Sequence, residues 1–369
     1  MSSISKSSPV EISKPFKTDI DFSQLRIGYV PCAISLKHPG DRRRFYYYAK
    51  KRGISYEIAK QNEHYDLVVL TQHADLSYWS KYKNNSTIII YDLIDSYLSI
   101  PYTNVKGLFR GPAKYIVGQS KQLKVNHWES IRDMCRKSNA IICSTDEQKK
   151  ILLDLNNNVH KILDFHDYFI NTNKLNYTSS DRFNLVWEGL PQNIDQFHVL
   201  NDALKKISKK YNIALHVLTD PIYKKYMGKF TNVNTLHQLC KIYKNSYLYN
   251  WNIHTLTSII CSFDLAIIPI DLTNEFTSGK PANKLLLFWR MAMPVITSAT
   301  KANVKTMNDA GVLMYCKNTA EWVEMLETYI NNETMRKKSA KIGNKFVKDK
   351  YSTNTLMRQW DYLFKSVLN

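Results

Sequence analysis

The sequence lacks any apolar run that approaches the roughly eighteen residues a membrane-spanning helix needs. Residues 1–17 are rich in serine and lysine and lack the apolar core of a secretory signal. We therefore expect a cytoplasmic protein in which residues 1–20 form a flexible leader.

The sequence also lacks the common metal, disulfide and catalytic motifs. Its 6 cysteines form no C-x-x-C pair and its 10 histidines no H-x-x-x-H pattern, so we expect free thiols in a reducing compartment and no metal site. The sequence contains no G-x-S-x-G, Walker or G-x-G-x-x-G motif. It therefore lacks the motifs typical of hydrolases, NTPases and dehydrogenases, respectively.

Acidic residues are few relative to basic ones. The chain has 51 Lys+Arg against 32 Asp+Glu, a formal net charge of +19. This balance favours an anionic partner such as nucleic acid, an acidic membrane surface or a phosphorylated substrate, although a solvated lysine-rich surface accounts for much of it. With 369 residues, 44% of them hydrophobic, the chain is long enough for two globular domains.

Short apolar runs alternate with helical patterns along the chain. We predict strands at residues 26–30, 66–70, 88–91, 140–144, 184–187, 213–218, 265–269, 294–297 and 311–315, and helices at 121–138 and 321–330. Such alternation predicts parallel sheets covered by helices. A polar bridge at residues 171–181 suggests domains at 21–178 and 179–349, and residues 350–369 predict a helix with an apolar stripe. Ligands of such folds bind beyond the carboxyl ends of the strands.

The most informative segment follows the predicted strand at 265–269. A polar loop containing Ser278 and Gly279 leads to a helix that begins near Pro281, with Lys280 and Lys284 beside its start. The free N–H groups and positive dipole end of a helix, next to two lysines, form a site for a diphosphate. The alternative is a capped helix with solvated lysines.

The order of several segments resembles the GT-B glycosyltransferases, close to glycosyltransferase family 4. The segments that carry the resemblance are residues 138–149 (SNAIICSTDEQK), 184–192 (NLVWEGLPQ), 262–269 (SFDLAIIP), 280–289 (KPANKLLLFW) and 293–298 (MPVITS), followed by the apolar tail. The resemblance implies two Rossmann-like domains with a cleft between them and a C-terminal helix that crosses back to the first domain.

The same resemblance implies an activity. A sugar would pass from a UDP- or GDP-sugar to a glycan, lipid-linked or other anionic acceptor, in surface polysaccharide or glycoconjugate synthesis. The nucleotide sugar would be a co-substrate with no bound cofactor and no metal, and the anomeric configuration would be retained. The donor-binding residues implied are Glu188, Gly189, Ser278, Gly279, Lys280, Asn283 and Lys284.

The lysines would neutralise the diphosphate as it becomes a leaving group. Two positions depart from the family pattern. Leu287 stands where family 4 members usually carry a glutamate that grips the ribose, and Ala292 stands where they place a glycine. Glu275 is one candidate for the missing carboxylate, although the simpler interpretation is that it is a solvent-exposed loop residue.

The first domain should bind the acceptor. After its first strand comes a glycine-containing loop that ends in Asp41, Arg42, Arg43 and Arg44. Guanidinium groups match phosphates and carboxylates in bidentate geometry. The alternative is a helix start with Asp41 as the N-cap and the arginines on a solvated face.

The catalytic group should lie after the second or third strand of the first domain. Asp92 is our first candidate, followed by Asp95 and His73, since an acid or imidazole at a strand's carboxyl end can act as a base or position a hydroxyl. Residues 165–167 (FHD) lie near the domain crossing and are a further candidate. Each residue alone also fits a structural role, such as capping a helix.

Two other classes of function remain open. A non-enzymatic binder of nucleic acid or an anionic polymer would use the net charge and the arginine–tyrosine run at residues 42–48, but no nucleic-acid module is found, so no nucleic-acid partner is expected. A GT-B relative with other chemistry, such as an epimerase or a polyol-phosphate transferase, is the second. The basic surface also permits peripheral contact with the inner face of an anionic membrane. The oligomeric state is open.

Overall fold

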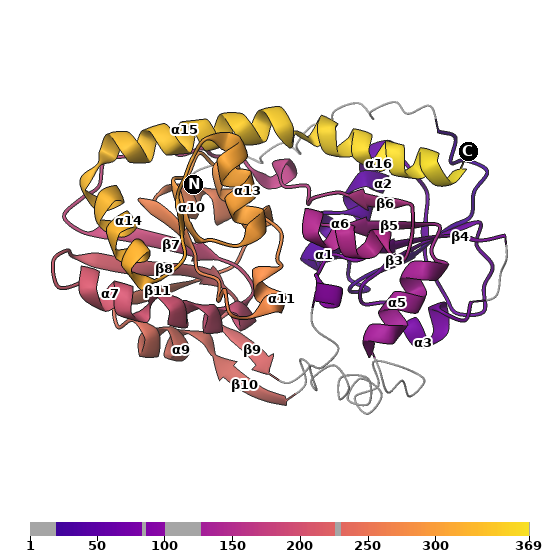
Figure 1. Cartoon of the computed structure of the whole chain (residues 1–369), viewed down its shortest axis with the longest axis horizontal. Helices are drawn as coiled ribbons and strands as arrows, with labels where there is room; N and C mark the ends of the chain where they lie inside the picture. Colours follow the sequence, from indigo (N-terminus) through magenta and orange to yellow (C-terminus); the bar gives the residue numbers. More distant parts are fainter. Residues whose placement is uncertain (1–19, 83–85, 100–126, 226–229, 369) are drawn as a thin grey trace, which may run out of the picture.

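The structure is a computed structural model that describes residues 20–82, 86–99, 127–225 and 230–368. It contains two α/β domains, each built on a parallel sheet of six strands, as the sequence predicts (Figure 1). The first domain carries β1–β6 and the second carries β7, β8 and β11–β14. The domain boundaries at 178/179 and 349/350 stay predictions.

The first sheet has the strand order β2-β1-β3-β4-β5-β6. Its strands are β1 (Ile27–Val30), β2 (Glu57–Ile58), β3 (Leu67–Thr71), β4 (Ile88–Asp92), β5 (Ala140–Cys143) and β6 (Val159–Lys161). The four inner strands are the predicted ones, because strands buried on both faces read as continuous apolar runs. The two edge strands have only two and three residues and carry no such signal.

The second sheet has the order β11-β8-β7-β12-β13-β14. Its strands are β7 (Phe183–Glu188), β8 (Ile213–Thr219), β11 (Ser246–Asn250), β12 (Leu265–Ile268), β13 (Val295–Ser298) and β14 (Tyr315–Cys316), and an antiparallel pair, β9 (Ile222–Lys225) and β10 (Phe230–Asn234), lies apart. Most of the strand predicted at 311–315 is wrong: Gly311 ends a helix with a φ of 70°, and only Tyr315 pairs.

Helices cover both sheets. In the first domain they are α1 (Pro39–Arg42), α2 (Phe45–Arg52), α3 (Leu76–Trp79), α5 (His127–Lys137), α6 (Asp146–Leu153) and the 3-10 turn η1 (Tyr97–Ser99). After η2 (Asp167–Phe169), the second domain has η3 (Pro191–Leu200), α7 (Asn201–Ile207), α9 (Thr235–Ile242), α10 (Leu256–Cys261), α11 (Glu275–Ser278), α12 (Asn283–Arg290), α13 (Lys301–Ala310), α14 (Thr319–Asn331) and α15 (Glu333–Lys350). The helices predicted at 121–138 and 321–330 correspond to α5 and α14; residues 121–126 lie outside the described residues.

The last helix, α16 (Thr353–Leu368), crosses back to the first domain as predicted (Figure 1). Its Trp360 and Phe364 rings stack on Tyr48 of α2, each at a centroid distance of 5.4 Å. Asp361 accepts a hydrogen bond from the Tyr48 hydroxyl at 2.9 Å and forms an ion pair with Arg52. The apolar stripe of the tail is therefore part of the first domain's core.

Helix α12, which follows the predicted donor loop, is fixed by close packing on α15. A Cβ at Gly343 of α15 would lie 2.5 Å from the Trp289 ring of α12, so only glycine permits this approach. In the described part of the chain, no helix is both long and apolar enough to cross a membrane.

Candidate functional site

The carboxyl ends of the two sheets meet at the interface between the domains. Ser96, in the loop after β4, donates a hydrogen bond to the carbonyl of Gly279 at 3.2 Å. The backbone N–H of Asp164 donates to Asn283 Oδ1 at 3.3 Å, at the start of α12. Any ligand of these loops would therefore contact both domains.

Lys284, in the first turn of α12, is the central cation of this interface. Its ammonium lies 4.1 Å from the centroid of the Trp187 ring on β7. Burial lowers the pKa of Lys284 to about 8; Glu188 opposes this shift, and Lys280 and Arg43 add to it. Among the described residues, the ammonium has no hydrogen-bond or ion-pair partner. It is a half-buried, partly desolvated cation without a counter-ion among these residues.

Lys280 lies one turn before Lys284 and is half-buried. Its ammonium donates to Asn193 Oδ1 at 2.8 Å. Burial lowers the pKa of Lys280, and Asp95 of the first domain opposes the shift. No side chain of the described residues caps the start of α12, which follows Ala282, so its first N–H groups are open to an anion.

Glu188 and Gly189 end β7, next to Lys284. The Glu188 side chain is buried, with the residue 5% exposed, and it raises the pKa of both Lys284 and Arg42. A Cβ at Gly189 would lie 2.5 Å from Lys284 Nζ and 2.8 Å from the Trp187 ring. Glycine therefore permits the close approach of the β7 turn to the cation.

Arg42 and Arg43 reach the same place from the first domain. Arg42 lies over the Trp251 ring of the second domain at 4.5 Å from its centroid and donates to the Tyr168 hydroxyl at 3.1 Å. Burial lowers the pKa of Arg42, and Arg43 adds to this effect. Arg43 is buried and close enough to Lys284 to lower its pKa. These two predicted acceptor residues thus lie beside the predicted donor cations.

Residues 165–167 lie where the chain crosses between the domains. His166 is buried, with Nε2 3.5 Å from Arg43 Nη1. Burial and the neighbouring arginines lower the pKa of His166 well below its usual value, so the ring is neutral. Asp167 forms an ion pair with Arg290 of α12 and accepts from the Thr353 N–H of α16 at 2.9 Å. This pairing favours a structural role for Asp167 at the crossing.

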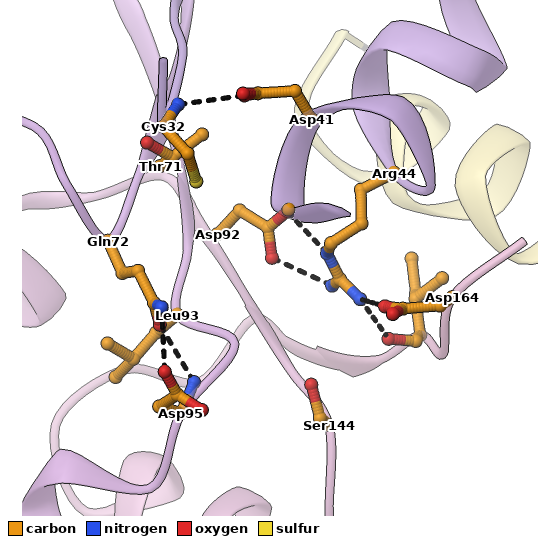
Figure 2. A network of polar contacts seen from close by, with 12 residues as sticks. Cys32, Asp41, Arg44, Thr71, Gln72, Asp92, Leu93, Asp95, Ser144 and Asp164 are labelled. Carbon is orange, nitrogen blue, oxygen red and sulfur yellow. Dashed lines mark hydrogen bonds and ion pairs between the residues drawn. The ribbon is translucent and has the colours of Figure 1, made fainter. Parts of the chain in front are cut away.

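Arg44 and Asp92 form a buried ion pair within the first domain. Both Asp92 oxygens accept from the Arg44 guanidinium at 2.7 Å, and Figure 2 shows the fork continuing to Asp164 at 3.1 Å. The two residues are 0% and 1% exposed. This placement favours a structural role over the predicted acceptor-binding and catalytic ones.

Asp41 is likewise buried. Its carboxylate accepts from the Tyr29 hydroxyl at 2.6 Å and from the N–H groups of Cys32 and Ala33 at 2.7 and 3.0 Å. It shapes the loop after β1 and is not an N-cap, since His38 caps α1. The ligand atoms of Cys32, His38 and Asp41 lie within 4.8 Å of one another, but the Asp41 oxygens are taken and burial raises the pKa of the Cys32 thiol. The group therefore fits a metal ion poorly.

The other two catalytic candidates are Asp95 and His73. Asp95 accepts from Gln72 Nε2 at 2.8 Å (Figure 2). It is also close enough to Lys280 to raise the pKa of that lysine. His73 is exposed, and its ring centroid lies 5.3 Å from that of His38. Asp95 is thus the candidate carboxylate that acts on a donor-loop lysine across the interface.

The remaining predicted donor residues have local partners. Ser278 ends α11 and donates to the Glu275 carbonyl at 3.2 Å, while the Glu275 side chain is exposed. Leu287 is fully buried in α12 and offers no polar group to a ligand. Ala292 has a φ of 54°, the left-handed region that favours glycine, so the backbone keeps a glycine conformation with an alanine in place.

One hollow lies away from the interface. It has a volume of about 700 Å³ and lies at the amino ends of β1 and β2, lined by Ile20–Ser23, Leu25–Ile27 and Arg52–Glu57. It is the wrong edge of a parallel sheet for a ligand site, and we assign it no function. A smaller pocket lies between the domains, where Ser144 and Lys161 face Ala282 and Lys305.

Some interface residues were missed by the sequence reasoning. Trp251 follows β11, whose sequence SYLYN has a single aliphatic residue and gave no buried-strand signal. A strand assigned there would have placed Trp251 at the carboxyl edge of the sheet. Asn193, the partner of Lys280, lies in η3 and had no signal.

Comparisons with known proteins find similarity in structure only. No family model matches the chain, and no curated protein matches it. A glycosyltransferase from Rickettsia africae superposes with a TM-score of 0.59 at 13% identity, covering 93% of this chain and 98% of that one. Sucrose-phosphate synthase from Thermosynechococcus elongatus gives 0.55 at 12% identity, covering 87% of this chain and 75% of that one.

A third similar structure is a mutant of TarM from S. aureus in complex with fondaparinux, alpha-GlcNAc-glycerol and UDP. It gives a TM-score of 0.54 at 13% identity over 80% of this chain, which spans 55% of the TarM chain. At these identities the similarity concerns the fold. The order of the strands in both sheets, the returning helix α16 and these structures agree: the chain has the GT-B glycosyltransferase fold.

Proposed function

We propose that the protein is a glycosyltransferase that uses a nucleotide-sugar donor, with the diphosphate bound at Lys284. The observation that carries the proposal is the state of Lys284: a half-buried, partly desolvated ammonium without a counter-ion among the described residues, beside Lys280 and Arg43. Withdrawing an unpaired charge from water has a free-energy cost. An anionic ligand removes that cost.

Three features suit a diphosphate in particular. The uncapped start of α12 offers N–H groups, Gly189 leaves room for close approach, and Lys280 lies one turn away. In the transfer step the bond between the anomeric carbon and the phosphate oxygen breaks while the anomeric carbon bonds to an acceptor oxygen. The acceptor hydroxyl loses its proton to the leaving phosphate or to water, and charge grows on the leaving diphosphate. Fixed cations in a desolvated site stabilise that charge more than they stabilise the ground state.

The finer assignments are part of the same proposal. The donor is a UDP- or GDP-sugar, the acceptor is a glycan or lipid-linked molecule on the side of Arg42 and Arg43, and the reaction is retaining and metal-independent. We place Asp95, whose charge acts on Lys280, closer to the reacting atoms than Asp92. The presence of UDP in the TarM structure supports a nucleotide donor for this fold.

A thermal-shift screen tests the proposal. The probes are UDP, GDP, ADP and CMP with their common sugar conjugates, on the wild type, Lys284→Ala and the control Lys338→Ala, an exposed lysine of α15. A ligand that binds only the native state raises the melting temperature by mass action. We expect one nucleoside diphosphate to stabilise the wild type and the control, and not Lys284→Ala.

Other outcomes separate the competing functions. If no nucleotide shifts the wild type and a polyanion such as heparin stabilises all three proteins alike, the protein is a binder of anionic polymers. If a nucleotide sugar binds but product analysis shows an epimerised sugar or a transferred polyol phosphate, the protein has the same fold but catalyses a different reaction.

A further inference from the structure

Glu188 is an exception among the buried acidic residues. In the described ranges, Asp41, Asp92 and Asp264 are also buried, and each accepts hydrogen bonds, the last from the Asn184 N–H at 2.7 Å. Glu188 is buried to a similar degree, yet its side chain has no hydrogen bond or ion pair within the described residues. Glu188 raises the pKa of Lys284 without forming an ion pair with it.

A carboxylate without a hydrogen bond in a largely buried side chain is unfavourable. Removing a polar group from water without giving it a hydrogen bond destabilises the folded chain, and a charged group does so more strongly. Two opposite charges that lie in one site without contact leave space for a ligand that satisfies both. That ligand must present an anionic oxygen to Lys284 and a hydrogen-bond donor to Glu188.

A nucleotide sugar carries both kinds of group side by side. Its diphosphate is anionic, and the rings on either side of the diphosphate carry hydroxyls that donate hydrogen bonds. Another phosphate is disfavoured at Glu188, because two anions would then be buried in contact. The carboxylate therefore suits a hydroxyl of the ribose or of the transferred sugar.

The position of Glu188 favours the transferred sugar. Glu188 ends β7, in the middle of the second sheet, and it is close enough to Arg42 of the first domain to raise the pKa of that guanidinium. The transferred sugar must lie between the diphosphate and the acceptor, and the proposed function places the acceptor on the Arg42 side. A carboxylate between Lys284 and Arg42 therefore borders the sugar.

We propose that Glu188 accepts hydrogen bonds from hydroxyl groups of the donor's sugar and so selects nucleotide sugars over nucleoside diphosphates. This inference rests on the proposed function. Glu188 is a specificity residue with two opposite effects: it attracts the sugar hydroxyls and repels surplus negative charge beside the diphosphate.

Calorimetric titration separates these effects. UDP, UDP-glucose, UDP-N-acetylglucosamine, GDP and GDP-mannose are titrated into the wild type, Glu188→Gln and the control Glu333→Gln, an exposed carboxylate of α15. In Glu188→Gln we expect the affinity for the nucleoside diphosphate to stay or rise, while the preference for its sugar conjugate falls at least tenfold. Glu188→Asp, which keeps the charge but withdraws it by one methylene, should also lose that preference.

Three outcomes overturn the inference. Equal weakening of the diphosphate and its sugar conjugate in Glu188→Gln would place the carboxylate on the ribose. Unchanged binding of both in Glu188→Gln and Glu188→Asp would leave it with a structural role. Absence of binding of any nucleotide to the wild type overturns the proposed function and this inference together, whereas the first two outcomes leave the proposed function standing.

Discussion

The first domain and the domain interface each bury charged side chains, but they do so in opposite ways. Around Arg44, charges are paired: Asp92 takes two guanidinium N–H groups, and Asp164 and the Ile162 carbonyl accept another. Around Lys284, charges are left apart: neither the ammonium nor the Glu188 carboxylate has a hydrogen-bonded partner in the described ranges.

The difference teaches where to look for function. Both regions contain basic side chains that are at least partly buried, so burial alone does not tell a structural region from a ligand site. A network in which every group has a partner stabilises one arrangement of the chain, whereas unpaired charges keep a site ready for a ligand. The predictions below test this contrast.

The largest expected effect is on stability, from the paired region. Arg44→Met leaves the buried Asp92 and the half-buried Asp164 without their cation, and removing one partner of a buried pair costs about 3–5 kcal/mol. Urea unfolding should show a corresponding fall in the free energy of unfolding relative to Lys338→Ala. An unchanged denaturation midpoint for Arg44→Met would contradict a structural role for this pair.

The second effect is on binding, from the unpaired region. Lys284→Met removes a desolvated cation from the diphosphate site, which should weaken nucleotide binding by about 2–4 kcal/mol. The free energy of unfolding without ligand should stay or rise, because no unpaired ammonium is then buried. Calorimetric titration of this variant measures nucleotide affinity, and urea unfolding measures its free energy of unfolding. A fall in stability as large as that of Arg44→Met would contradict the contrast between the paired and the unpaired region.

A smaller effect is the dependence of binding on pH. Because the pKa of Lys284 is about 8 in the folded protein, below its usual value, the free site loses its charge as the pH rises above 8. Affinity for UDP or GDP should therefore hold below pH 8 and fall above it, by at most about tenfold per pH unit. Lys284→Arg keeps its charge in this range and should show a flatter profile.

The last effect concerns the turn after β7. Gly189→Ala would place a methyl group against Lys284 Nζ and the Trp187 ring, so these side chains must shift at a cost of about 1–3 kcal/mol. We expect weaker nucleotide binding. The matched control is Gly53→Ala, which meets no atom within 4 Å but has a φ of 70°, so it should lower stability and leave binding unchanged.

The fold could be predicted well from the sequence because the patterns that mark strands and helices are local in the sequence. The inner strands are apolar runs, and the tail helix shows its stripe in residues 356–364. The site was predicted in part: Lys280 and Lys284 do lie at the domain interface. The sequence offered no way to tell Arg42 from Arg44, two residues apart, since the direction of each side chain depends on the packing of α1 and α2.

Asp92 shows the same limit. A carboxylate at the carboxyl end of a buried strand fits both a base and an ion-pair partner, and only the position of Arg44, far away in the sequence, favours the second. Trp251 follows β11 and Asn193 lies in η3, two elements whose sequences carried no strong pattern. Their proximity to the cations is a tertiary property.

The return of α16 also bears on how the protein is made. Tyr48 is covered by Trp360 and Phe364, which a ribosome adds only after the whole second sheet has been synthesised. The first domain therefore cannot complete its core during translation in the usual N-to-C order of domains. Until α16 emerges, its docking surface on α2 is uncovered on the nascent chain, and this face is where a chaperone would be needed.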